Sequence, residues 1–199
     1  MTSFALQVRD MWRETAAYAK QIKSFERSDW FAYLMWIGTI MGLLVGTSFF
    51  VIWSYAHGVQ WPGYVWNIPL GTAVFVFALA FDDIGHRTAY KQDLKKGEAY
   101  VHKMIVITAV GSVVTLCLGY QHPETMQMPA LSLIALSLFY SAIDEALHWH
   151  RYLTKKLDRV EMWSHFAAIC GHVIMISSWW QWYRAGYPGV AQALEVLPW

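Results

Sequence analysis

The segment "WFAYLMWIGTIMGLLVGTSFFVIWSYA" at residues 30–56 decides the fold, because it contains no Asp, Glu, Lys or Arg. The uncharged run continues to Phe81, which is long enough for two membrane crossings with a turn between them. Three more uncharged runs, each close to the ~20 residues of a spanning helix, follow at 104–123, 125–143 and 162–183. We therefore expect an all-α polytopic membrane protein with five transmembrane helices, at about 31–56, 64–88, 98–120, 127–150 and 160–184.

The composition supports this class of protein. Of the 199 residues, 56% are hydrophobic and 12 are tryptophan, and the mean hydropathy is +0.28. A soluble domain is less apolar and less aromatic than this. The net charge of +1 gives no indication of a nucleic-acid partner, so the partner that we expect is the lipid bilayer.

The basic residues predict the orientation. They gather in the N-terminal segment and in the connections after the second and fourth helices, and only Arg184 lies at the opposite face. The members of this basic face are Arg9, Arg13, Lys20, Lys23, Arg27, Arg87, Lys91, Lys95, Lys96, Lys103, Arg151, Lys155, Lys156 and Arg159. The positive-inside rule then predicts a cytoplasmic N-terminus and an external C-terminus, and we expect an integral protein of a bacterial inner membrane.

Two parts are expected along the chain. In residues 1–27, apolar side chains recur near helical spacing opposite the basic ones, which predicts an amphipathic helix on the cytoplasmic surface. A docking surface for a partner membrane subunit is the alternative for this segment. Residues 28–199 are expected to form a single five-helix transmembrane domain.

An internal repeat places acids and histidines at the ends of four of these helices. The first copy, about 64–120, contains "FDDIGHR" at 81–87 and "EAYVH" at 98–102; the second, about 127–184, contains "IDEALHWHR" at 143–151 and "EMWSH" at 161–165. Each copy therefore reads D-[DE]-x-x-H, a basic connection, and E-x-x-x-H. Because both copies cross the membrane in the same sense, a two-fold axis along the membrane normal would relate them.

Helical spacing predicts that these residues converge. Side chains three or four residues apart share a helix face. Folding each copy into a hairpin brings the acids and histidines of its two helices to the same level, in two layers about 6 Å apart. We expect the second to fifth helices to form a four-helix bundle made of two repeated hairpins. The candidate metal ligands inside it are Asp82, Asp83, His86, Glu98, His102, Asp144, Glu145, His148, Glu161 and His165.

This pattern resembles the ligand plan of the ferritin-like di-iron carboxylate proteins, in which two helices supply a Glu each and two supply Glu-x-x-His. The matching segments here are Asp83-x-x-His86 and Glu145-x-x-His148, together with Glu98 and Glu161. The resemblance covers only these turns and implies a bound pair of iron ions. An Asp replaces one Glu, the order of the motifs differs, and His102 and His165 add two imidazoles, which leaves the metal and its coordination number open.

Charge also favours bound metal. Four carboxylates gathered near the edge of a bilayer repel one another and are costly to desolvate. Two divalent ions would neutralise them, with the imidazoles as neutral ligands. Mixed oxygen and nitrogen donors suit iron, with manganese or zinc as alternatives. For a single acid or histidine, a solvated position or an ion pair, such as Asp82 with Arg87, is the simpler explanation.

Two more residues are candidates for a catalytic role. Tyr140 lies one turn before Asp144 and His172 lies two turns after His165, each on the same helix face as the ligand. The leading prediction is a di-metal oxidase or oxygenase acting on a membrane-soluble substrate, with electrons from a reductase. A subunit that binds haem b and transfers electrons from quinol is one alternative, and an accessory subunit of a larger membrane complex is another.

Overall fold

The structure, a computed structural model, describes residues 3–88, 96–155 and 159–198. Helices make up nearly all of these residues, and no strand occurs among them. In chain order the helices are α1 (Ser3–Ala19), η1 (Lys20–Ser24), α2 (Arg27–Ala56), η2 (Gly63–Trp66), α3 (Asn67–Arg87), α4 (Lys96–Leu118), α5 (Pro123–Lys155), α6 (Arg159–Arg184) and α7 (Val190–Val196).

Five of these helices, α2 to α6, are long and apolar enough to cross a membrane, as the sequence predicts. Two of them, α2 and α5, begin four residues earlier than predicted. The start of α2 at Arg27 is fixed by a capping box, in which Glu26 and Asp29 each accept a hydrogen bond from the other's backbone N–H. The helix α5 starts at Pro123, since the first helical position needs no N–H donor, and it continues through Pro129.

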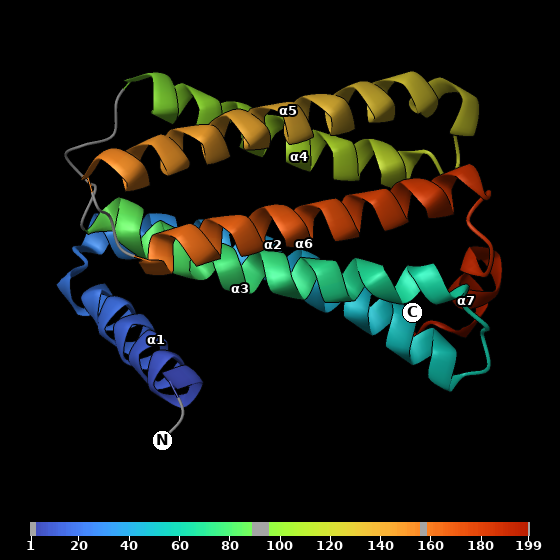
Figure 1. Cartoon of the computed structure of the whole chain (residues 1–199). Helices are drawn as coiled ribbons and strands as arrows, with labels where there is room; N and C mark the ends of the chain where they lie inside the picture. Colours follow the sequence, from blue (N-terminus) through green and yellow to red (C-terminus); the bar gives the residue numbers. More distant parts are fainter. Residues whose placement is uncertain (1–2, 89–95, 156–158, 199) are drawn as a thin grey trace.

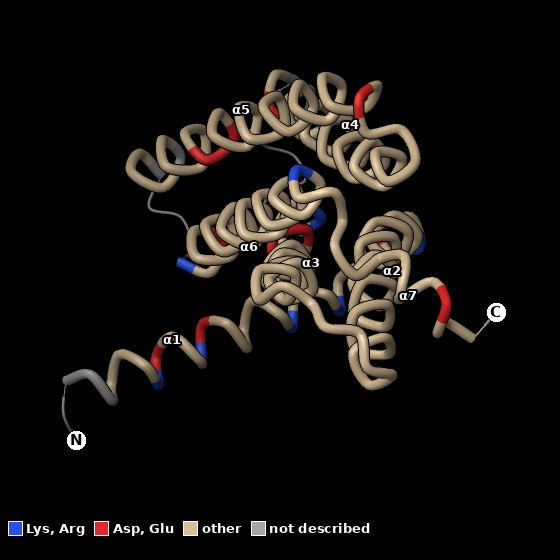
Figure 2. Tube along the Cα trace, turned by 90° about the vertical axis from the view of Figure 1, so that its right-hand side faces the viewer, with Lys and Arg blue, Asp and Glu red and all other residues tan. Residues whose placement is uncertain are grey.

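The spanning helices pack in two pairs. Along their length α3 packs against α6 and α4 packs against α5, while α5 also contacts α6 (Figure 1). Figure 2 shows the α4–α5 pair lying over the α3–α6 pair, with α2 beside α3. The predicted hairpins are α3 with α4 and α5 with α6. The closest packing therefore joins a helix of one hairpin to a helix of the other. Among the described residues, α3 and α4 do not pack along each other.

Two glycines allow α3 and α6 to come together. A Cβ atom at Gly71 would lie 2.6 Å from the backbone nitrogen of Met175 and 2.8 Å from the carbonyl oxygen of Gly171. Reciprocally, a Cβ atom at Gly171 would lie 2.6 Å from the backbone nitrogen of Phe75. Small residues at such contacts let helix backbones approach closely in a membrane. The α3–α6 pair therefore depends on glycine at both positions.

We expect Gly71→Ala to lower the stability of the folded protein by about 1–3 kcal/mol, because the added methyl group must push two backbones apart. Thermal unfolding of the purified protein, followed by circular dichroism, measures this as a lower midpoint. Gly42→Ala in α2 is the matched control, since a Cβ atom there meets nothing within 4 Å. A midpoint that falls equally in both variants would show that the close contact is unimportant.

The end of the molecule that carries α7 is held together by side-chain hydrogen bonds. Tyr187 donates to the carbonyl of Leu116, Tyr183 donates to the carbonyl of Pro123, and Trp53 donates to the carbonyl of Val196 at 2.9 Å. These bonds tie the end of α6 to α4 and α5, and tie α7 to α2.

At the opposite end, which we call the α1 end, α3 finishes and α4 and α6 begin (Figure 1). Tyr18 is 1% exposed and packs with Ile84 and Val160, which fixes the end of α1 against α3 and α6. The rest of α1 extends away from the spanning helices, and its Trp12 is 66% exposed (Figure 1). The membrane-surface role of this helix remains a prediction. Of the basic residues named for orientation, Lys91, Lys95 and Lys156 lie outside the described residues.

Candidate metal centre

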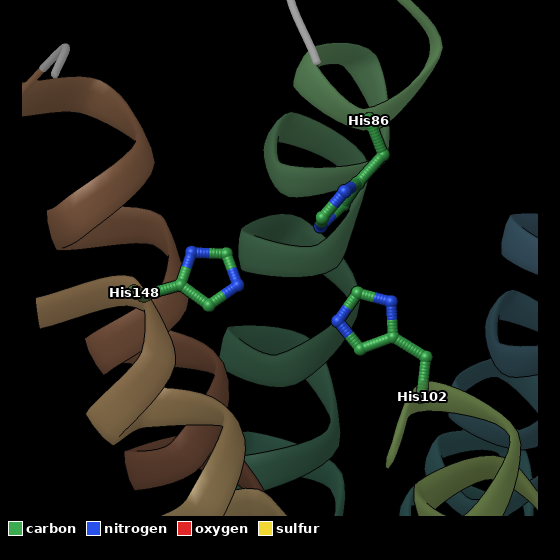
Figure 3. A group of neighbouring side chains, drawn as sticks. All are labelled: His86, His102 and His148. Carbon is green, nitrogen blue, oxygen red and sulfur yellow. The ribbon is translucent and has the colours of Figure 1, made fainter. Parts of the chain in front are cut away.

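Eight acidic and histidine side chains from four helices lie in the interior at the α1 end. We call this set the carboxylate–histidine cluster. Figure 3 shows three of its imidazoles, from α3, α4 and α5, pointing toward one another. Its members are Asp82 and His86 of α3, Glu98 and His102 of α4, Asp144 and His148 of α5, and Glu161 and His165 of α6.

Asp144 bridges two of the imidazoles. Its Oδ1 lies 3.0 Å from Nε2 of His102, and its Oδ2 lies 2.8 Å from Nε2 of His165. The ring of His148 stacks on that of His165 with 3.9 Å between centroids, and its Nε2 is 3.8 Å from Oδ1 of Asp144. One carboxylate thus faces imidazoles from three helices.

The side chains of α3 also lie near the imidazoles of α4 and α5. Oδ2 of Asp82 lies 3.4 Å from Nε2 of His86, whose ring is 4.8 Å from that of His102 and 5.8 Å from that of His148. Two sets of three ligand atoms lie within 4.8 Å of one another: one from His86, His102 and His148, the other from Asp82, His148 and His165. Both sets contain His148, whose free nitrogen can bind only one ion, so an ion in the other set would be held by the remaining two residues of that set.

Several polar atoms of the cluster are buried without a hydrogen bond. His148 is fully buried and Glu161 is 1% exposed. Unsatisfied atoms of this kind cost free energy unless another group or an ion binds them. Among the described residues, the buried cluster atoms without a hydrogen bond are Oδ1 of Asp82, both ring nitrogens of His86, Oδ1 of Asp144, Nε2 of His148 and Oε2 of Glu161. Oδ1 of Asp144 is close to Nε2 of His102, at 3.0 Å, but the geometry of this contact is not that of a hydrogen bond.

Hydrogen bonds on the outer side of the cluster orient two of its imidazoles. Nδ1 of His148 lies 2.9 Å from Oε1 of Glu161, and Nδ1 of His165 lies 2.6 Å from Oε2 of Glu145. The indole of Trp149 donates to the other oxygen of Glu145 at 2.8 Å. Carboxylates that accept from Nδ1–H are the usual second partners of metal-bound histidines, since they leave Nε2 free to bind the metal.

His165 has a carboxylate at each ring nitrogen, which a neutral imidazole cannot satisfy. With one proton it donates to Glu145 or to Asp144, and the other contact then brings two lone pairs together. A second proton on the ring, or a metal ion that takes Nε2 and the Asp144 carboxylate as ligands, removes this conflict. The donor set of the cluster therefore fits a bound cation.

Asp83 does not reach the cluster. Its Oδ2 accepts a hydrogen bond from Nε of Arg87 at 2.8 Å, so the predicted motif Asp83-x-x-His86 does not act as a unit. Asp82 and Asp83 lie on opposite sides of His86 around the helix, and the bond to Arg87 holds Asp83 on the side away from the cluster. Glu145, the equivalent acid in the second copy, instead contacts Nδ1 of His165, the ring nitrogen that does not face Asp144.

The two residues suggested for catalysis lie in different places. Tyr140 is half-buried beside Tyr100 and does not line the cavity described next. His172 is 2% exposed, its ring packs edge-on against Phe75, and its Nε2 lies 3.2 Å from Oγ of Ser137. The sequence pattern did not predict this contact of Ser137 with His172, although Ser137 lies two turns before Asp144 and therefore on the same face of α5.

A cavity of about 560 Å³ extends from the cluster toward the centre of the molecule, and sequence analysis did not anticipate it. Asp82, His86, His102, Asp144 and His165 line one end of it. Apolar side chains from α2, α4 and α6 line most of the remainder. Its volume is in the range of small-molecule sites.

No protein-family model matches the chain, and neither a curated protein nor a solved structure matches it.

Proposed function

We propose that this chain is an integral membrane metalloprotein whose carboxylate–histidine cluster binds two divalent ions and acts as an oxidase or oxygenase on a membrane-soluble substrate. The observation that carries the proposal is the convergence of four carboxylates and four imidazoles from four helices, with buried oxygen and nitrogen atoms that lack hydrogen bonds. Iron is the preferred ion, with manganese or zinc as alternatives, because the donors are nitrogen and oxygen only.

Charge balance supports two ions. Asp82, Asp144, Glu98 and Glu161 carry four formal negative charges in a buried region, and two divalent ions match them with neutral imidazoles as the remaining ligands. Asp83 and Glu145 are not needed for this balance. Arg87 neutralises the first, and the second holds His165.

The internal repeat supports a paired site. A two-fold axis that relates the two copies would exchange α3 with α5 and α4 with α6, and would thereby map the α3–α6 pair onto the α5–α4 pair. These are the two closely packed pairs. The cluster takes one Asp, one Glu and two His from each copy. We propose a cytoplasmic location for the α1 end because the basic residues gather there.

The proposed reaction needs dioxygen and an electron donor. In an oxygenase, a C–H bond of the substrate, O₂, two electrons and two protons give a C–OH bond and water. Iron at the site would supply the redox chemistry, and a reductase or a membrane quinol would supply the electrons. The residues of this chain hold the ions, orient the imidazoles and, through the apolar cavity, keep water from the reacting carbon.

An isotope experiment tests this function. The iron-loaded protein in lipid nanodiscs is reduced chemically without air and then exposed to ¹⁸O₂, and the extracted lipids are analysed by mass spectrometry. We expect an ¹⁸O-labelled hydroxyl group in one lipid component. Oxygen consumption without ¹⁸O in any lipid would support an oxidase and exclude an oxygenase acting on these lipids. No consumption by the metal-loaded protein would contradict the proposed enzyme and favour an accessory subunit.

A further inference from the structure

The cavity has apolar walls over most of its length. The helices α2 and α4 contribute Ile40, Leu43, Val106, Val110, Val113 and Val114. Thr39 of α2 also lines it, but its hydroxyl already donates to the carbonyl of Met35 at 2.7 Å. Such walls favour a hydrocarbon chain over a charged or water-soluble ligand.

The cavity opens toward the lipid between α2 and α4. Among the described residues, α2 packs against α3 and α7 but not along α4. Val110 and Val114 line the cavity and are also 46% and 50% exposed, so they form one rim of this opening. The exposed Thr39 lies on the opposite rim. A molecule dissolved in the bilayer can therefore reach the cavity sideways.

Among the described residues that line the cavity away from the cluster, one side chain has a buried polar atom without a hydrogen bond. We assign the hydroxyl proton of Ser137 to its 2.9 Å contact with the carbonyl of Ile134, so that its oxygen accepts from Nε2–H of His172 at 3.2 Å. In this assignment the His172 ring is neutral and its Nδ1 is an acceptor. Nδ1 is buried without a hydrogen bond, and His172 lines the cavity.

His172 lies seven residues beyond His165 on α6, about 10 Å from the level of the cluster. We propose that the cavity binds an uncharged bilayer molecule with a hydrocarbon chain and a hydroxyl group, and that the hydroxyl donates a hydrogen bond to Nδ1 of His172. The chain then extends toward the cluster, so the carbon nearest the metals is remote from the hydroxyl. This inference deepens the proposed function and rests on it only for the claim that the bound chain reaches reacting metals.

Native mass spectrometry of the delipidated, metal-loaded protein tests the binding, with 1-dodecanol and n-dodecane as probes. We expect the alcohol to bind about tenfold more tightly than the alkane, as one additional buried hydrogen bond implies. His172→Phe keeps the shape but removes the acceptor, so the two probes should bind equally. Val110→Trp should reduce binding of both, whereas Ile107→Trp, at a position that is 61% exposed outside the cavity lining, should change neither.

Equal binding of both probes to the unaltered protein, or a preference for the alcohol that survives His172→Phe, would overturn the inference. Metal content is measured in the same samples, and none of these three substitutions should change it. Binding of the alcohol that depends on His172 in a protein without metal would reject the proposed metal site but keep this inference. Bound metal without any preference for the alcohol would keep the proposed metal site but reject this inference.

Discussion

Protein with His148→Ala is expected to lose bound metal during purification, with metal affinity reduced at least about tenfold. His148 is the one residue shared by the two sets of ligand atoms that lie within 4.8 Å of one another. It is fully buried, and its Nδ1 already contacts Glu161, so only Nε2, which lacks a hydrogen bond, is free to bind metal. Removing this ring takes a ligand from whichever of the two sets binds an ion through it. Elemental analysis of metal per chain measures the loss.

His150→Ala provides the matched control. His150 is on the same helix, two residues further along, and it is exposed. Its loss should leave the metal content unchanged. Equal metal content in the unaltered protein and both variants would mean that His148 is not a ligand. Circular dichroism of each variant separates loss of metal from loss of the helical fold.

Glu145→Gln is expected to weaken metal binding about 10- to 100-fold while the fold is kept. Glu145 accepts hydrogen bonds from His165 and from Trp149, and so holds the His165 ring with Nε2 toward Asp144. The amide of glutamine has the same shape, but it lacks the charge that strengthens the bond to imidazole. Titration of the metal-free protein with Fe²⁺ under anaerobic conditions measures the change.

Asp83→Asn is the control for this second prediction, because Asp83 is the equivalent acid of the first copy of the repeat. Since its carboxylate binds Arg87 and not a histidine, this substitution should leave Fe²⁺ affinity within about twofold of the unaltered protein, below the 10-fold lower bound expected for a residue that orients a ligand. If the two variants lose affinity equally, the distinction that we draw between the two acids is wrong.

The sequence predicted the spanning helices well because long uncharged runs have few alternatives in a membrane protein. The repeat of acids and histidines also identified the residues of the cluster, since a spacing of four residues places Asp82 with His86 and Asp144 with His148 on one helix face. The capping box of α2 and Pro123 of α5 make these two helices start earlier than their uncharged runs predict. Such local effects depend on single residues and are harder to foresee.

Other features depend on tertiary packing, which helical periodicity does not encode. The choice of α6 as the main partner of α3 follows from the contact between Gly71 and Gly171, two glycines that lie far apart in the chain. Asp83 and Glu145 occupy equivalent positions in the two copies of the repeat, but their partners differ. Asp83 binds Arg87, whereas Glu145 accepts a hydrogen bond from His165. The cavity arises where helices from both copies meet. The pairing of His172 with Ser137 joins α6 to α5, the two helices of the second copy.

The central claim is that imidazoles and carboxylates from both copies bind a pair of iron ions inside one bundle. Mössbauer spectroscopy of ⁵⁷Fe-enriched protein, combined with iron per chain, tests it most directly. We predict two irons per chain with the signature of antiferromagnetic coupling and no Soret band. A single iron with a sharp Soret band, or protein that carries no metal after expression in iron-rich medium, would contradict the account.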